Sequence, residues 1–174
     1  MKTRFKFLLL LIVLLLSIPA HAKWRYEEKI DRMSGEVSIS AISRLTPPEE
    51  LPRYPYHELK ASFQYRCDTE KESAFIVFNE KLPLDNLQRD DYGVWFVETR
   101  INFDNDRFTE LLLTQPFAHG IAFYHNSQEY IRRIKHSSSA LLEVVIKGIP
   151  PVYFTFDLEG AGAAITQAKQ NCKL

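Results

Sequence analysis

This sequence has few of the residues on which common catalytic and metal-binding motifs depend. Its 174 residues include two cysteines, five histidines and six glycines. The patterns C-x-x-C, H-E-x-x-H and G-x-S-x-G are all missing. These absences argue against a structural zinc site, a zinc protease and a serine hydrolase of the nucleophile-elbow type. We therefore expect no metal, no cofactor and no catalytic residues.

The remaining candidates for chemistry are isolated histidines and adjacent carboxylates. The histidines have no ligand-like spacing, so we expect them to be exposed in loops. The pairs Glu49–Glu50 and Asp90–Asp91 lie in polar stretches. Neighbouring loop carboxylates share one solvated environment, whereas acid/base catalysis needs two different environments. We expect both pairs to be solvated.

An excess of charge of one sign is also missing. The chain carries 22 basic and 22 acidic residues. Three of the basic residues and none of the acidic ones lie in residues 1–22, so residues 23–174 carry 19 against 22, a net charge of −3. A mildly acidic domain has no general attraction for nucleic acid or anionic lipid. We expect neither as a partner.

The sequence has one long hydrophobic run, Phe7–Ile18, near its start. Basic residues precede it and Ala20–Ala22 follows it with small residues at both ends. This order is typical of a secretory signal peptide, and the run is short for a membrane span. We predict cleavage after Ala22, export to the periplasm, and a single domain over residues 23–174 that does not insert into the membrane. An uncleaved anchor is the alternative.

Alternating hydrophobicity predicts a mainly β fold. Leu59–Cys67 alternates apolar and polar side chains, and the apolar run Ala74–Phe78 follows after a polar turn, which is typical of a hairpin. We predict an antiparallel, sandwich-like domain built from two sheets. Further strands and a short helix are expected at 24–27, 37–41, 94–103, 108–114, 121–124, 128–136 (the helix), 140–146 and 152–158.

The last segment, 160–172, changes to helical periodicity and carries the second cysteine. Cys172 lies on the apolar face of this helix, and Cys67 lies on the apolar face of its strand. An even number of cysteines in an exported chain is typical of disulfides. We predict a Cys67–Cys172 bond that ties the helix to the sheet and closes a loop of roughly 100 residues. Two free thiols are the alternative.

Exposed aromatic side chains are the predicted contact surface. Residues 46–56 contain four prolines and must form a loop, which carries Tyr54 and Tyr56. These tyrosines either contact a partner or pack onto the domain. Together with Tyr92 and Trp95 they form our hypothesis for a partner surface, because aromatics dominate binding hot spots.

One charge in a strand also needs a partner. Arg100 lies within the 94–103 strand, both faces of which are rich in apolar residues. Glu98 shares its face, and we expect the two to form a structural salt bridge; an anionic ligand bound by Arg100 is the alternative.

Several of these features resemble the periplasmic TagO/VasI-like proteins associated with type VI secretion. The resemblance covers about residues 59–174 and rests on three motifs: the strand 59–67 ending in Cys67, the pattern Arg100-x-x-Phe103-Asp104, and Phe154–Gly160 continuing through a helix to Cys172. It implies a non-enzymatic periplasmic accessory protein whose partner is an envelope or secretion-system protein. It brings no catalytic residues.

Two alternatives remain for function. The segment Phe63–Asp68 resembles the opening of periplasmic inhibitors of c-type lysozyme, although no tyrosine follows Ser34-Gly35 where their inhibitory loop has one. An inhibitor of a cell-wall hydrolase is therefore the first alternative. An enzyme that acts on the cell wall is the second.

Overall fold

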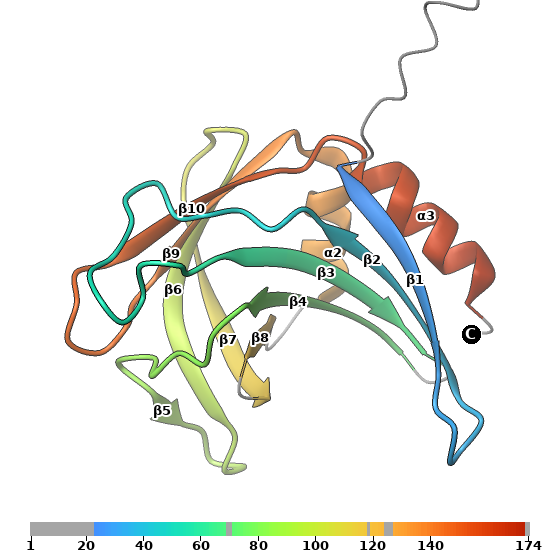
Figure 1. The fold of residues 1–174 in the computed structure, drawn as a ribbon, viewed down its shortest axis with the longest axis horizontal. Helices are drawn as coiled ribbons and strands as arrows, with labels where there is room; N and C mark the ends of the chain where they lie inside the picture. Colours follow the sequence, from blue (N-terminus) through green and yellow to red (C-terminus); the bar gives the residue numbers. More distant parts are fainter. Residues whose placement is uncertain (1–22, 69–70, 118, 124–126, 173–174) are drawn as a thin grey trace, which may run out of the picture.

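A computed structural model describes residues 23–68, 71–117, 119–123 and 127–172. The predicted signal peptide, residues 1–22, lies outside the described residues. In the described part of the chain, ten strands form one antiparallel sheet (Figure 1). Their bounds are β1 Trp24–Ile30, β2 Val37–Ser43, β3 Ala61–Cys67, β4 Glu72–Phe78, β5 Gln88–Arg89, β6 Trp95–Phe103, β7 Thr109–Phe117, β8 Gly120–Phe123, β9 Ser139–Val144 and β10 Val152–Asp157.

The sheet follows the order β1-β2-β3-β4-β8-β7-β6-β9-β10, and β5 pairs with β6. The predicted apolar face of β3 is confirmed, since its apolar residues are buried; on the other face Arg66 is exposed but Ser62 is buried. Most strands direct one apolar face inwards, so the sheet must curl to cover the core, whereas β1 buries only Trp24 and β5 is exposed. Phe63 on β3 meets Phe156 on β10, with ring centroids 4.5 Å apart, although the two strands are far apart in the sheet order.

The predicted mainly β, sandwich-like class is confirmed, but its layers are arranged differently. The two layers are halves of one hydrogen-bonded sheet, where the sequence suggested two separate sheets. The prediction also ended the strand 108–114 before Pro116. β7 instead continues to Phe117, with a register shift between Thr114 and Phe117. A proline has no N–H to donate, and an irregular register is where a sheet tolerates one.

The chain after β2 bridges the two edges of the curled sheet. Thr46 exchanges two hydrogen bonds with Ala61, at 2.8 and 2.9 Å, and Glu49 N donates to Tyr153 O at 2.8 Å. Near the start of β1, Lys23 pairs with Asp157 at 2.7 Å. These contacts attach β10, the last strand, to the first part of the chain.

Two helices, α2 Ser127–His136 and α3 Ala161–Asn171, pack against each other (Figure 1). α3 also packs against β2 and β1, and α2 packs against β4. The buried residues of α3 are Ala161, Ile165 and Ala168, as its periodicity predicts. The predicted disulfide Cys67–Cys172 is present and joins the end of α3 to β3, with the Cα atoms 6.1 Å apart. No described helix has both the length and the apolar character needed to cross a bilayer.

Candidate protein-binding groove

Two proline-containing segments meet beside β10. One is the loop 46–57, and the other is the turn 146–151 that leads into β10. The hydrogen bond from Glu49 N to Tyr153 O fixes the loop to the strand, and Thr155 Oγ1 donates to Glu49 Oε1 at 2.6 Å. Because proline restricts the backbone on both sides, the shape of the space between them is largely set before any ligand arrives.

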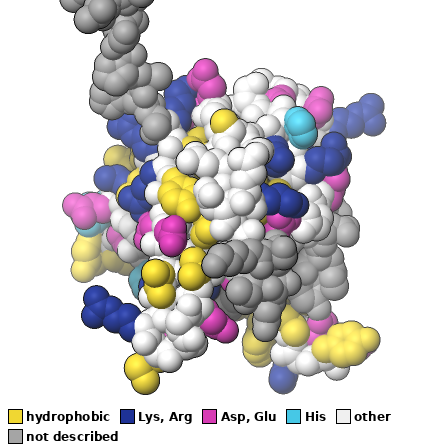
Figure 2. Space-filling model, turned by 90° about the vertical axis from the view of Figure 1, so that its right-hand side faces the viewer, with side chains coloured by type: hydrophobic (Ala, Val, Ile, Leu, Met, Phe, Trp, Pro, Cys, Tyr) yellow, Lys and Arg dark blue, Asp and Glu magenta, His cyan; other side chains and the backbone are white. Residues whose placement is uncertain are grey.

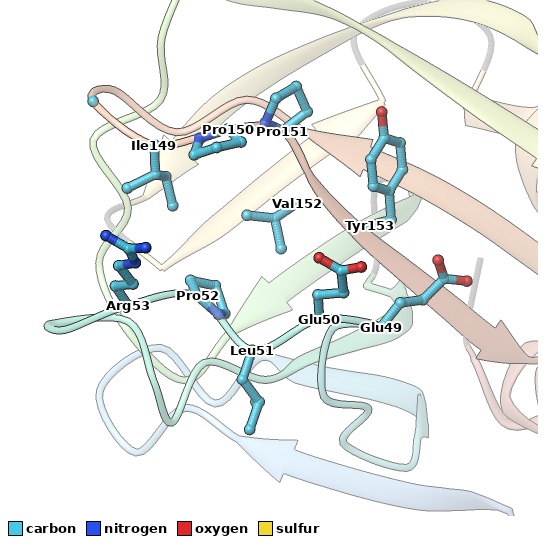
Figure 3. A pocket seen from close by; sticks show the side chains of 11 residues that line it. Glu49, Glu50, Leu51, Pro52, Arg53, Ile149, Pro150, Pro151, Val152 and Tyr153 are labelled. Carbon is cyan, nitrogen blue, oxygen red and sulfur yellow. The ribbon is translucent and has the colours of Figure 1, made fainter.

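That space is a groove of about 620 Å³ (Figure 3). Its volume lies within the usual range for ligand sites. We call it the β10 groove; its lining residues are Glu49, Glu50, Leu51, Pro52, Arg53, Gly148, Ile149, Pro150, Pro151, Val152 and Tyr153.

The β10 groove has an apolar centre and opposite charges at its ends. Figure 3 shows Pro52 and Val152 between the two segments. The Glu50 carboxylate lies on the side of Tyr153, and the Arg53 guanidinium lies at the other end, beside Ile149. Within the described residues, neither Glu50 nor Arg53 takes part in an ion pair. The groove thus offers an apolar surface with two charges available for a ligand.

Tyr153 is held in place by a charged cluster on the outside of the sheet. Its hydroxyl donates to Glu143 Oε2 at 2.9 Å, and Arg100 Nε donates to Glu143 Oε1 at 3.0 Å, while Arg100 Nη2 pairs with Oε2. Arg100 lowers the pKa of Glu143, against the opposing effect of burial. Glu143 in turn raises the pKa of Tyr153. The buried carboxylate therefore stays ionised and orients the tyrosine at the end of the groove.

The partner of Arg100 corrects the expectation from the sequence. The salt bridge is present, but it forms with Glu143 on β9, and the predicted partner Glu98 is wrong. The register of β6 and β9 pairs Ile101 with Leu142, which places Arg100 opposite Glu143. Cross-strand neighbours lie about 5 Å apart, closer than residues i and i+2 of one strand. Glu143 could have been found from its position within the apolar 140–146 strand, where a charge needs a partner.

A second, smaller cavity of about 200 Å³ lies on the other side of Tyr153. The Arg100 guanidinium lies over the Phe108 ring there, 5.6 Å from its centroid. Asn102 Oδ1, on the same strand as Arg100, is buried with no hydrogen-bond partner among the described residues. Tyr153 lines both cavities, so a change at the Arg100–Glu143 pair reaches the β10 groove through this side chain.

The four predicted contact aromatics fall into two pairs. Tyr54 and Tyr56 lie on the proline-containing loop that also lines the groove. Tyr54 is 85% exposed and stacks with His57, whereas Tyr56 packs against the core. Tyr92 and Trp95 lie at the turn between β5 and β6, at the lower end of Figure 1, while the proline-containing loop lies at its left.

The turn that carries Tyr92 is tightly organised although its aromatic side chain is 92% exposed. Asp90 Oδ1 accepts hydrogen bonds from Tyr92 N at 2.9 Å and Val94 N at 2.7 Å. Arg89 Nε donates to Gly93 O at 3.0 Å, and its guanidinium lies over the Trp95 ring at 5.7 Å. This arrangement holds Tyr92 outward on a fixed backbone.

Of the adjacent carboxylate pairs, one member of each has a structural task. Glu49 is exposed, as predicted, and also accepts from Thr155, whereas Asp90 is half-buried and organises its turn. Glu50 and Asp91 are exposed, as expected.

The predicted exposure of the histidines is confirmed for His57, His119 and His136. His125 lies outside the described residues. No cluster of three or more histidine, cysteine, aspartate or glutamate side chains suited to a metal occurs in the described part of the chain.

A second buried carboxylate serves the helices. The Glu72 side chain is 5% exposed and receives Lys169 Nζ at 2.8 Å, Tyr65 OH at 3.0 Å and Gln128 Nε2 at 2.9 Å. Burial would raise the pKa of Glu72, but these three partners outweigh it and lower the pKa. The network joins α2 and α3 to β3 and β4, so its task is structural.

The face of the molecule that includes α3 and β1 has no surface of one charge. Figure 2 shows Lys and Arg scattered among Asp and Glu, with hydrophobic side chains between them. This distribution fits the even balance of charge in the sequence.

The fold and the groove define an antiparallel β domain with a disulfide-tied helix and a preformed surface groove. Comparison with protein-family models, curated proteins and solved structures finds no match to this chain.

Proposed function

We propose that this chain is a non-enzymatic binding protein of the periplasm, an accessory to an envelope or secretion-system protein. The β10 groove is the observation that carries the proposal. It is bounded by proline-containing segments, so the protein loses little conformational entropy when a ligand binds in it. Its apolar centre supplies contact area, and Glu50 and Arg53 at its two ends, which form no ion pair within the described residues, supply specificity. The resemblance to TagO/VasI-like proteins supports the same role.

The turn 90–94 between β5 and β6, which we call the Tyr92 turn, favours the first alternative, an inhibitor of a cell-wall hydrolase. A fixed turn with an exposed aromatic tip can enter a concave site with little loss of entropy. Inhibition of a muramidase by the purified chain would select this alternative. Release of soluble cell-wall fragments by the chain alone would instead select an enzyme.

The proposal is tested by retaining partners from periplasmic extract on the tagged chain. The groove variant is E50K/R53E, which exchanges two exposed charges and keeps the net charge. A matched control is R32E/E36K in the turn after β1, where both residues are also exposed. We expect an envelope or secretion-system protein to be retained by wild type and control and lost by the groove variant. Equal retention by all three would show that the groove is not the contact surface.

Export is tested by the intact mass of the protein recovered from the periplasm. We expect the mass of residues 23–174 less two hydrogens, because the signal peptide is removed and Cys67 and Cys172 are bonded. A chain that remains in the cytoplasm with residues 1–22 attached would contradict a periplasmic role.

A further inference from the structure

We infer that the β10 groove recognises an extended peptide segment with a basic and an acidic residue four positions apart and an apolar residue midway between them, all three on the same face of the segment. This inference rests on the proposed function and names the chemistry of the ligand. It follows from the charges, the backbone and the apolar centre of the groove.

The spacing of the two ligand charges follows from Glu50 and Arg53. The two residues are three positions apart, so their Cα atoms are at most about 10 Å from each other. An extended ligand rises about 3.3 Å per residue and its side chains alternate between two faces. Two charges with one apolar side chain between them on the same face are therefore four positions, or about 13 Å, apart, and the long side chains of Glu50 and Arg53 can reach across the difference. Glu50 attracts a basic residue and Arg53 an acidic one. Their positions at opposite ends of the groove (Figure 3) fix the order of the two charges.

The extended form of the ligand follows from the position of β10. β10 ends the sheet, so one of its edges has no strand beside it. Glu49 N already donates to Tyr153 O at this edge, so the loop 46–57 occupies it there and the part left for a ligand lies towards the turn 146–151. Pro150 and Pro151 precede β10 and line the groove; their carbonyl groups can accept hydrogen bonds, but they have no N–H to donate. A peptide with free N–H groups complements such an edge.

The residue midway between the two ligand charges faces the centre of the groove, which is lined by the apolar side chains of Pro52, Ile149 and Val152. Burial of apolar ligand side chains there supplies affinity, while the end charges supply direction. A nucleic acid or another polyanion does not complement a groove that has two glutamates at one end.

The test uses four acetylated, amidated and fluorescein-labelled peptides with the central sequences Lys-Ser-Val-Ser-Glu, Glu-Ser-Val-Ser-Lys, Lys-Ser-Val-Ser-Lys and Glu-Ser-Val-Ser-Glu. Fluorescence anisotropy measures their Kd for wild type, E50K/R53E and the control R32E/E36K. We expect wild type and control to prefer one of the mixed-charge peptides about tenfold over its reverse, since two exposed ion pairs exchange attraction for repulsion. The E50K/R53E variant is expected to prefer the reverse peptide.

This inversion of preference cannot arise from damage to the fold, because the variant gains affinity for one peptide. The same order of preference in wild type and E50K/R53E would overturn the inference, as would equal affinity of wild type for all four peptides. Loss of the natural partner by E50K/R53E together with equal peptide affinities would leave the proposed function intact and contradict only the peptide chemistry.

Discussion

Glu143 is buried, 8% exposed, and depends on Arg100 and Tyr153 for its hydrogen bonds. The substitution Arg100→Gln removes the cation and leaves a buried carboxylate with poorer compensation. Because Arg100 itself is half exposed, we expect a loss of about 1–2 kcal/mol in the free energy of unfolding at pH 7, below the cost for a fully buried pair. Urea denaturation measures this loss. Arg107→Gln, at an exposed arginine, is the control, and an equal effect of both variants would contradict a role for the pair.

The lowered pKa of Glu143 also predicts how the stability of the fold changes in acid. Arg100 lowers its pKa in the folded protein, so the unfolded chain binds more protons than the native state in acid. The stabilisation is present above the unfolded pKa of about 4.3 and is lost as the pH falls through the lower folded value. We expect the melting temperature to fall less steeply between about pH 5 and 3 in Glu143→Gln than in wild type. Parallel curves would show that Glu143 does not contribute.

At the scale of elements, Gly162 sets the distance between the two helices. A Cβ at this position would lie 2.7 Å from Lys135 O at the end of α2. Alanine is intrinsically the better helix former by about 1 kcal/mol, so helix propensity alone predicts that Gly162→Ala stabilises the protein. We expect the opposite, a lower free energy of unfolding, because the backbone of α2 must move.

The control for this prediction is Ala163→Gly, at the next and exposed position of α3. There, propensity alone acts, and we expect a loss of about 0.5–1 kcal/mol. Thermal unfolding of both variants measures whether Gly162→Ala lowers the stability, as we expect. If Gly162→Ala were more stable than wild type, the helices would have room to separate.

The sequence predicts β3, β4 and α3 well, because each of these predictions needed only the local pattern of apolar residues. β3 follows from alternation, β4 follows from an apolar run after a polar turn, and α3 follows from three- and four-residue spacing. The partner of Arg100 was not predictable in the same way, since it depends on the register between β6 and β9. A register that joins residues some forty positions apart has no local signal.

The β10 groove was missed for a related reason. The sequence marks 46–56 as a proline-containing loop, but nothing in it shows that this loop returns to β10. Glu50 and Arg53 become a pair of end charges only after Glu49 has bonded to Tyr153, about a hundred residues later. The aromatic residues chosen by composition lie next to this groove or on the separate Tyr92 turn, because exposure alone does not define a site.

For the whole molecule, the disulfide decides how well the last helix holds to the sheet. Cys67 and Cys172 are 105 residues apart, so their bond constrains most of the described chain when it unfolds. The chain-entropy model gives about 4–5 kcal/mol for a loop of this length. We expect the double variant C67A/C172A to lose a stability of this order in urea, and wild type reduced with dithiothreitol to lose a similar amount without any change of side chain.

The same bond separates stability from recognition, because it lies at the end of α3 while the β10 groove lies between the loop 46–57 and the turn 146–151. Reduced wild-type protein that is still folded should therefore keep the mixed-charge peptide preference of the oxidised protein. A changed preference on reduction would mean that the disulfide also positions the loop 46–57. An unchanged free energy of unfolding would mean that the Glu72–Lys169 contact and the buried face of α3 hold the helix without it.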